Sequence, residues 1–283
     1  MSTITVFGAG LLGAGMVRNL AEKGHAVRVW NRSPGRAAPL ADCATVCTSP
    51  ADALEGAERL HILLSEDDAV DSVLALAMGA IQPGLPVLDH CTNLPARVAA
   101  RSAALRAQGV QYLHAPVFMG PANMREGSGL MLIAGPSAEV EALQPALSEL
   151  TGKVWHVGER VDLAAVHKLS GNALLLSLSG VLGDILSMGE AQGLSPDETM
   201  AVFEVFRPGG ALVPMAKRVT SAATAPPSFE LAMAQKDVRL MIAAANGPEG
   251  LVVLPAVAAA MAAAAAAGHG QQDFAIYARP RAR

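Results

Sequence analysis

A glycine-rich turn near the start of the chain has the residue types and the spacing of a phosphate-binding site. Residues 8–13 read Gly-Ala-Gly-Leu-Leu-Gly. In such a turn the first glycine permits a tight bend, the second lets the backbone approach a pyrophosphate, and the third lets the following helix pack closely on the preceding strand. The N-terminus of that helix would face the phosphate charge. The residues that we expect at the pyrophosphate are Gly8, Gly10, Leu11, Leu12 and Gly13.

The segment after the second expected strand indicates which dinucleotide binds. A site for NAD usually has Asp or Glu about 20 residues after the glycines, where the carboxylate holds the ribose 2′-hydroxyl. This chain has Asn31, Arg32 and Ser33 there, followed by Arg36. An arginine and a serine hydroxyl would bind a 2′-phosphate through charge-assisted hydrogen bonds, whereas a carboxylate would repel it. The sequence therefore predicts NADP, with NADPH preferred over NADH. The alternative is that the arginines are solvated loop residues.

Lys168 and Asn172 are the residues that we expect to act on the substrate. Bound NADP usually implies hydride transfer, which needs a proton donor or acceptor beside an alcohol or carbonyl oxygen. The two residues are four positions apart in a predicted helix and therefore share a face. A desolvated lysine has a lowered pKa and can exchange a proton near neutrality, while an amide can hold a substrate oxygen. From the spacing alone, a surface lysine with an ordinary helical neighbour is the alternative.

Short apolar runs alternate with helical patterns over residues 1–160 and predict a largely parallel sheet covered on both faces. The first β-α-β unit is complete within about 30 residues, which favours the dinucleotide turn over a plain glycine turn. Ligands of such sheets lie beyond the carboxyl ends of the strands, so Leu64–Ser65 and Asp89–Thr92 are candidates to touch the cofactor. We expect strands at 3–7, 26–30, 59–64, 86–89, 111–114, 130–134 and 153–156, and helices after residues 10, 50, 67, 95 and 137.

The pattern changes after residue 160, and residues 161–283 predict an all-α domain. A long apolar helix should begin at the boundary and end near Gln192, and Ser195–Glu198 has the pattern of a capping box that starts the next helix. A glycine inside a helix costs roughly 1 kcal/mol relative to alanine, so repeated glycines indicate close packing. The glycines of the long helix are Gly171, Gly180, Gly183 and Gly189. The predicted fold is an α/β Rossmann-type NADP-binding domain (1–160) followed by an all-α substrate and dimerisation domain (161–283).

Composition and charge argue against several classes of protein. The 283 residues are 52% hydrophobic and 16% charged, which predicts a globular protein with a large core. A net charge of −4 and a pI near 6.0 give no electrostatic reason to expect nucleic acid or an anionic membrane as a partner. The first strand leaves no room for a secretory signal, and the apolar runs favour helices buried in protein over a membrane span.

The three cysteines indicate neither a disulfide framework nor a metal site. Cys43 and Cys47 have no histidine nearby in the sequence, as a zinc site would require. Cys91 lies beside His90 and Thr92 and is a candidate nucleophile, although a small buried hydrophobe is the commoner role of cysteine. This cysteine usage predicts a cytoplasmic protein.

A series of ordered motifs resembles the β-hydroxyacid dehydrogenase family, the group that contains 3-hydroxyisobutyrate and tartronate semialdehyde reductases. The resemblance covers almost the whole chain, and several motifs in order are far more specific than any one of them. The matching segments are Gly8–Gly13 with Arg18–Leu20 and Gly24, Leu64–Asp68, Asp89–Thr92 with Pro95, Lys168–Asn172, Phe229 with Lys236–Asp237, and Gly268–Gly270 with Asp273.

The resemblance implies an NAD(P)-dependent dehydrogenase or reductase acting on CH–OH groups. Lys168 would be the general acid/base at the hydroxyl or carbonyl oxygen, and Asn172 would help to anchor the substrate. Cofactor contacts would come from Leu64, Ser65, Thr92 and Lys236. For Lys236 the alternative is that it only forms an exposed pair with Asp237 on its helix. Members of the family commonly form dimers or tetramers, so a homodimer or homotetramer is expected.

The segment that binds the substrate carboxylate departs from the family pattern. It normally reads Asp-Ala-Pro-Val-Ser-Gly-Gly, whereas residues 114–120 read His-Ala-Pro-Val-Phe-Met-Gly. The serine hydroxyl is lost, and a hydrogen bond to a charged group contributes about 1.5–3 kcal/mol. We therefore expect a substrate that is larger or less polar than 3-hydroxyisobutyrate, with Asn123 or Arg125 as replacement donors. The residues expected to line its site, besides Asn172, are Thr92, Phe118, Met119, Gly120 and Asn123.

Two other functions stay open at this stage. An imine reductase is the first, because such enzymes share this architecture and prefer hydrophobic cyclic imines. Phe118 and Met119 favour it, but Lys168 opposes it, since related imine reductases usually carry Asp or Tyr at that position. The second is a non-catalytic NADP-binding protein such as a redox sensor, which would bind NADPH tightly without turnover.

Overall fold

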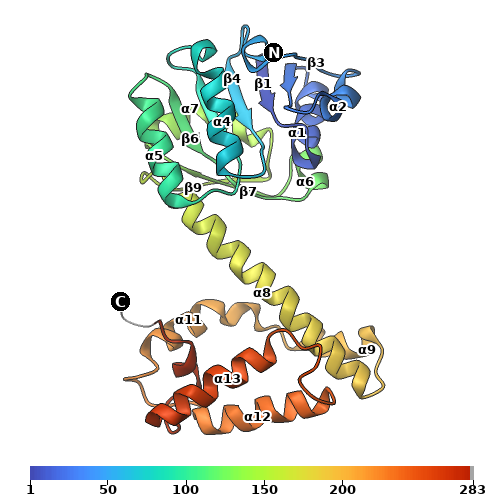
Figure 1. Cartoon of the computed structure of the whole chain (residues 1–283), viewed down its shortest axis with the longest axis vertical. Coiled ribbons are helices and arrows are strands. Elements are labelled where there is room, and N and C mark those ends of the chain that lie inside the picture. Colours follow the sequence, from blue (N-terminus) through green and yellow to red (C-terminus); the bar gives the residue numbers. More distant parts are fainter. Residues whose placement is uncertain (281–283) are drawn as a thin grey trace. The chain divides into compact units, whose positions relative to one another are not determined.

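The computed structural model describes residues 1–280 and divides into two compact units, Met1–Asn172 and Ala173–Arg283. The division lies inside the longest helix, α8 (Leu163–Ala191), whose first turns belong to the first unit (Figure 1). The boundary expected after residue 160 comes just before this helix. Each unit has its own apolar core and is described separately.

The first unit is built on a nine-stranded sheet. Its strands are β1 (Thr3–Phe7), β2 (Ala26–Trp30), β3 (Thr45–Val46), β4 (Arg59–Ile62), β5 (Pro86–Asp89), β6 (Gln111–His114), β7 (Val117–Phe118), β8 (Leu130–Ala134) and β9 (Lys153–Gly158). The order across the sheet is β3-β2-β1-β4-β5-β6-β8-β7, and β9 pairs with β8. From β3 to β6 every neighbouring pair is parallel. Successive strands are added on one side of β1 as far as β3 and then on its other side from β4 onward, so the order of addition reverses between β1 and β4. Ligands of open parallel sheets bind at such a reversal.

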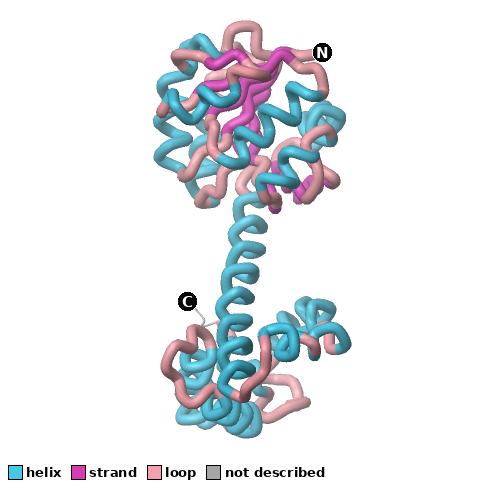
Figure 2. Tube along the Cα trace, turned by 90° about the vertical axis from the view of Figure 1, so that its right-hand side faces the viewer, coloured by secondary structure: helices cyan, strands magenta, loops and turns pink. Residues whose placement is uncertain are grey.

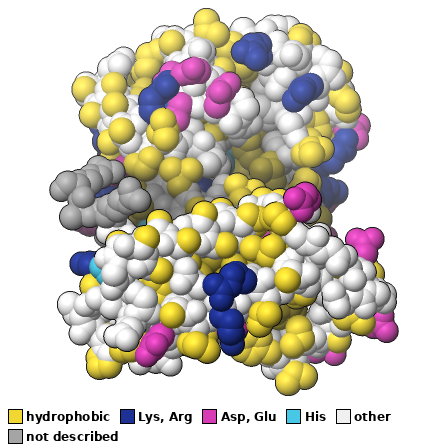
Figure 3. Space-filling model, turned by 60° about the horizontal axis from the view of Figure 1, so that its bottom comes forward, with side chains coloured by type: hydrophobic (Ala, Val, Ile, Leu, Met, Phe, Trp, Pro, Cys, Tyr) yellow, Lys and Arg dark blue, Asp and Glu magenta, His cyan; other side chains and the backbone are white. Residues whose placement is uncertain are grey.

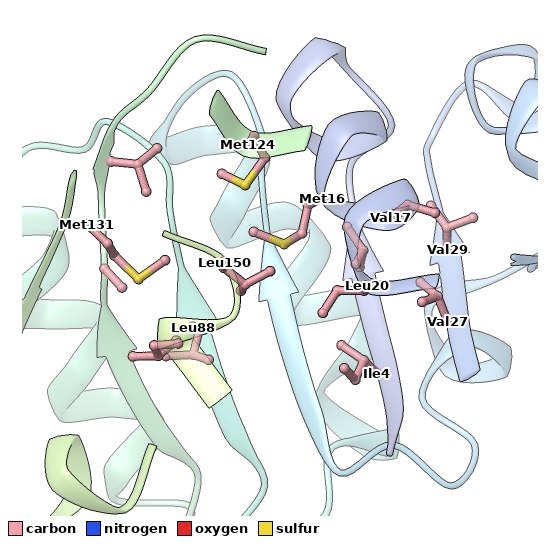
Figure 4. Packing of buried hydrophobic residues seen from close by; sticks show 14 of the residues in the cluster. Ile4, Met16, Val17, Leu20, Val27, Val29, Leu88, Met124, Met131 and Leu150 are labelled. Carbon is pink, nitrogen blue, oxygen red and sulfur yellow. The ribbon is translucent and has the colours of Figure 1, made fainter. Parts of the chain in front are cut away.

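Helices cover both faces of this sheet, as the tube view shows (Figure 2). The helices of the unit are α1 (Leu11–Glu22), α2 (Pro34–Ala37), α3 (Pro50–Ala53), α4 (Asp67–Ala77), α5 (Pro95–Arg106), α6 (Pro121–Glu126), α7 (Ser137–Ser148) and the start of α8. One apolar layer joins α1, α6 and α7 to one face of the sheet, with Met16 and Met124 at its centre (Figure 4). The other joins α3, α4 and α5 to the opposite face and includes Phe7.

The regular elements among the described residues of the second unit are helices, and one isolated β-bridge joins Glu230 to Asp273. Besides the rest of α8 it contains α9 (Pro196–Met200), α10 (Val202–Val205), α11 (Leu212–Ser221), α12 (Leu231–Ala244) and α13 (Leu254–Ala264). Buried side chains of α12 and α13 form its core, among them Leu231, Val238 and Met261. The carboxylate of Asp184 on α8 accepts hydrogen bonds from three consecutive backbone N–H groups, 252–254, at the start of α13. This bond set fixes α13 against α8.

The predicted fold class is confirmed: a Rossmann-type α/β unit precedes a helical one. All seven expected strands form, although β4 ends at Ile62 and β9 extends to Gly158. The two-residue strands β3 and β7 were not expected, because two residues are too few to show a period. The expected capping box at Ser195 and Glu198 is present, with Ser195 Oγ accepting from the N–H of Glu198.

The glycines of α8 mark close packing at three of their four positions. A side chain on Gly171 would collide with Phe118, one on Gly180 would crowd Val253, and one on Gly189 would collide with Thr199, whereas the space beside Gly183 is open. By length and hydropathy α8 is also long and apolar enough to cross a membrane. Only 6% of this apolar stretch is buried within the described chain, so the expectation of a helix buried in protein is wrong for the single chain. Asp184 is buried, because the start of α13 binds its carboxylate.

A chain of hydrogen bonds runs through the sheet interior across two buried histidines. Arg59 Nε donates to His61 Nε2 (3.2 Å), His61 Nδ1 lies 2.9 Å from His90 Nε2, and His90 Nδ1 lies 2.7 Å from the carbonyl oxygen of Ala115. Each nitrogen has a matching donor or acceptor only when both imidazoles are neutral, with the protons on Nδ1. Accordingly, burial lowers the pKa of His61 and lowers that of His90 to about 4.

The hydrogen bonds through His61 and His90 predict that the protein loses stability in mild acid. Below pH 6.5 the unfolded histidines gain protons that the folded ones do not, so the unfolded state is favoured as pH falls. The free energy of unfolding should drop by up to roughly 1.4 kcal/mol per pH unit for each histidine between about pH 6.5 and about pH 4. Urea titrations of the native protein and His90→Gln at about pH 7 and about pH 5 measure this. The variant should be less stable at neutral pH but should lose less on acidification; an equal loss would contradict the prediction.

Candidate functional site

The glycine turn between β1 and α1 has little room for side chains at two positions and open space at the third. Gly8 has φ +105°, and a Cβ there would collide with the carbonyl of Leu63. A Cβ on Gly13 would collide with the carbonyl of Gly8, whereas no atom lies within 4 Å of one on Gly10. The first and third glycines are therefore required by the fold, and the second leaves its backbone accessible at the N-terminus of α1. This arrangement fits a pyrophosphate, as the sequence predicts.

The segment after β2 is tied to the glycine turn by Asn31. Its Oδ1 accepts a hydrogen bond from the N–H of Ala9 (3.0 Å), and its Nδ2 donates to the carbonyl oxygen of Ser33 (2.9 Å). Arg32 and Ser33 are exposed beside it. The first acidic residue after β2 is Asp42, and it pairs with Arg18 at 2.9 Å. No carboxylate is thus placed to hold a ribose 2′-hydroxyl directly after β2.

The ends of β4 and β5 are joined by Cys91. The N–H of Leu64 donates to Cys91 Sγ (3.1 Å), and the N–H of Cys91 donates to the buried carboxylate of Asp89 (3.0 Å). Burial raises the pKa of the Cys91 thiol well above its ordinary value, so the group stays protonated and serves as a structural link rather than a nucleophile. The neighbouring Ser65 and Thr92 are exposed at this carboxyl edge of the sheet.

Lys168 is held at the start of α8 by two consecutive residues of β7. Its Nζ donates a hydrogen bond to the carbonyl oxygen of Val117 (2.7 Å) and lies 4.2 Å from the centre of the Phe118 ring. Within residues 1–280 no ion pair involves this ammonium group. Burial lowers the pKa of Lys168, since its partners are neutral and no carboxylate offsets the loss of water. The group is therefore a half-buried cation with N–H donors left for a ligand.

The predicted substrate segment at the end of β7 is partly engaged in its own structure. The amide oxygen of Asn123 accepts from the N–H of Gly120 (2.9 Å), and its Nδ2 donates to Ser128 Oγ (3.1 Å). Asn123 thus caps α6. Arg125, the other candidate donor, forms a salt bridge with Glu22 of α1. Both side chains are committed within the fold.

The structure brings some predicted residues together and leaves others apart. The turn 8–13, Asn31 and the ends of β4 and β5 lie on one edge of the sheet, and Phe118 lies against Lys168. Asn172 follows Lys168 by one turn of α8. Lys236 is on α12 in the second unit and pairs with Asp237 at 3.1 Å, so its cofactor role stays a prediction.

Two contributors to the site were missed by the sequence reasoning. One is the carbonyl of Val117, which no side-chain pattern could indicate. The other is Gly171, whose missing side chain makes room for the Phe118 ring: a Cβ there would come within 2.8 Å of Cε1 and closer still to Cζ. The sequence did hold one signal for this fit: Gly171 lies three positions after Lys168, and Phe118 replaces the serine of the family pattern.

Comparison with known proteins agrees with this geometry. Residues 3–158 match the family model described as the NAD binding domain of 6-phosphogluconate dehydrogenase. The glyoxylate/succinic semialdehyde reductase 1 of Arabidopsis thaliana is 29% identical over 94% of each chain, and the 3-hydroxyisobutyrate dehydrogenase of Pseudomonas aeruginosa is 26% identical over 97% of this chain and 96% of that one.

Among solved structures, an imine reductase from Myxococcus stipitatus in complex with NADP+ is 26% identical, with a TM-score of 0.82 and 98% of both chains covered. The family model spans more than half of the chain, and the curated relatives span nearly all of it. With its glycine turn, its doubly covered sheet and its helical second unit, the chain belongs to the β-hydroxyacid dehydrogenase family and is an NAD(P)-dependent oxidoreductase.

Proposed function

We propose that the protein is an NADP-dependent reductase that interconverts an aldehyde-acid and its hydroxyacid, with Lys168 as general acid/base. The observation that carries this proposal is the half-buried ammonium group of Lys168, which is held by neutral acceptors with N–H donors to spare. The relatives named as a glyoxylate/succinic semialdehyde reductase and a 3-hydroxyisobutyrate dehydrogenase support this substrate class.

The chemistry assigned to the chain is a proton transfer at Lys168. A bound nicotinamide supplies the hydride. Lys168 Nζ would donate a proton to the substrate oxygen in reduction and accept it in oxidation, which a lowered pKa favours near neutrality. The bond to Val117 holds Nζ in place and uses only one of its three N–H donors. Asn172, one turn further along α8, would hold the same substrate through its amide.

NADP is the cofactor that the loop after β2 favours. Arg32 and Ser33 are exposed beside the glycine turn, and Asn31 holds their backbone against it. A guanidinium group and a hydroxyl can both bind a 2′-phosphate, and no acidic residue lies between β2 and Asp42 to repel it.

An imine reductase is the second candidate function. Phe118 and Met119 make the segment beside Lys168 apolar, and the imine reductase from Myxococcus stipitatus has the same fold over the whole chain. NADPH oxidation measured with glyoxylate, succinic semialdehyde, a larger aldehyde-acid and a cyclic imine separates the two functions. Turnover of the imine alone would favour the second, and tight NADPH binding without any turnover would indicate a sensor.

The chain is also proposed to act as a homodimer or homotetramer. Leu174, Leu175, Leu176 and Leu178 lie on α8 and are 46–73% exposed, which is unusual for a row of leucines in a single chain. Apolar side chains also spread over much of the face in Figure 3. A second copy of the chain would remove this surface from water.

Lys168→Ala should abolish turnover and leave NADPH binding intact. General acid–base catalysis typically contributes about 10²–10⁴-fold, so kcat should fall by at least about a hundredfold. Fluorescence titration with NADPH should give an unchanged Kd, because the glycine turn does not contact this residue. Lys153→Ala, at an exposed lysine of β9, is the matched control. Undiminished kcat in Lys168→Ala would refute the catalytic role.

Arg32→Asp should reverse the cofactor preference. The change removes a cation and adds an anion where the 2′-phosphate would lie, so the Kd for NADPH should rise by about tenfold to a hundredfold while that for NADH changes little. The control is Arg207→Asp, at an exposed arginine of the second unit. An unchanged ratio of the two constants would count against the NADP assignment.

Leu176→Glu should weaken self-association. Light scattering should give the native protein a mass that is a multiple of 29.0 kDa and the variant a smaller mass. Leu76→Glu, on α4 and 68% exposed, is a matched control because it places the same charge on an equally exposed leucine elsewhere. A native protein of 29.0 kDa, or one recovered only from membranes, would overturn the proposal.

A further inference from the structure

The ring of Phe118 is packed between two residues of α8 that are three positions apart. One side of the ring faces the ammonium group of Lys168, with Nζ 4.2 Å from the ring centre. Its tip rests on Gly171, where an added Cβ would lie 2.8 Å from Cε1 and 3.3 Å from Cε2, and still closer to Cζ. Residues three apart on a helix share a face, so the ring spans the surface between them. Glycine is therefore the residue at position 171 that is compatible with this position of the ring, since every other residue would add a Cβ.

The ring and the neighbouring carbonyl act together on Lys168. Val117 and Phe118 are consecutive residues of β7, and both pair with β8, Val117 opposite Met131 and Phe118 opposite Leu130. The carbonyl oxygen of Val117 accepts one N–H of Lys168, and the π face of Phe118 attracts the charge. Both acceptors are neutral, so they orient the ammonium group without neutralising it.

We propose that Phe118 is the positioning residue for Lys168 and that Gly171 is its obligatory counterpart, the three forming one unit that sets the direction and the acidity of the lysine. The inference rests on the proposed catalytic role of Lys168. It assigns to Phe118 and Gly171 an effect on the chemical step rather than on cofactor binding.

Gly171→Ala tests the steric half of this unit. The methyl group must displace the ring and with it Lys168, and a misplacement of about 1 Å can cost up to about a hundredfold in rate. We expect kcat to fall by about tenfold or more with the Kd for NADPH unchanged. Gly183→Ala is the matched control, because it lies on the same helix with nothing within 4 Å of the added Cβ. It should have no effect on kcat.

A double-mutant cycle separates positioning from a general loss of structure. Phe118→Leu removes the ring tip, so adding Gly171→Ala to it should cost little, and the two effects should be strongly non-additive. Full additivity would overturn the proposal, as would an unchanged kcat in Gly171→Ala.

The acidity of Lys168 supplies a readout that does not depend on turnover. Phe118→Leu keeps an apolar side chain but removes the π face, so the lysine should lose stabilisation of its charged form. Its pKa should fall by up to about one unit. The rate of Lys168 acylation by a water-soluble ester, followed against pH by peptide mass spectrometry, measures this in every variant. An unchanged pKa in Phe118→Leu would overturn the positioning role, whether or not Gly171→Ala folds.

The two proposals can fail separately. If Lys168→Ala keeps full activity, the catalytic role of Lys168 is wrong, while the pKa shift in Phe118→Leu still reports the packing unit. If Lys168→Ala is inactive but the cycle is additive and the pKa is unchanged, Lys168 is catalytic and Phe118 is only a wall of the site.

Discussion

The lack of space around Gly8 and Gly13 is the constraint on which the site depends. The carbonyl of Leu63 excludes a side chain at Gly8, and the carbonyl of Gly8 excludes one at Gly13. Helix α1 can therefore begin directly against β1 and beside the end of β4, at the point where the strand order reverses. Because Gly10 faces open space between these two contacts, the same packing that closes the core presents a bare helix N-terminus to a phosphate.

Buried polar links hold the neighbouring strand ends in place. The carboxylate of Asp89, at the end of β5, accepts from Tyr112 (2.7 Å) and Asn93 (2.7 Å), and Arg101 lies 3.4 Å from it. Arg101 also pairs with Asp67 at the start of α4 (2.8 Å). Burial alone would lower the pKa of Arg101, but its contacts with Asp71, Tyr112 and Asp67 outweigh burial and raise it. Charges buried in this way are tolerated only when they are paired and hydrogen-bonded. The backbone on either side of the exposed Thr92 is therefore held in place by the buried hydrogen bonds of Asp89 and Asn93.

The sequence was sufficient for features that depend on local patterns. The glycine turn, the seven longer strands and the capping box at Ser195 each occupy a few consecutive residues, and each formed as expected. The family was likewise expected from ordered motifs, and the comparisons with known proteins confirm it.

Features that depend on distant partners could not be predicted. The short strand β7 exists only through its pairing with β8, and Arg125 contacts Glu22 across 103 residues of sequence. The amide of Asn123 caps α6, a local role that the preceding Gly-Pro pair could have suggested, while its expected contact with the substrate stays a prediction. The fit of Phe118 against Gly171 also depends on distant partners, because neither residue predicts the contact without the other.

The environment of Lys168 shows how this difference bears on chemistry. A carboxylate partner would hold the proton more tightly and cancel the charge, which would make the lysine a poorer acid toward a substrate oxygen. Here the carbonyl of Val117 and the ring of Phe118 provide orientation while burial lowers the pKa. Both contacts come from a two-residue strand whose position is set by β8. The reactivity of a helix residue is thus decided by sheet pairing, a relation that the motif containing Lys168 does not encode.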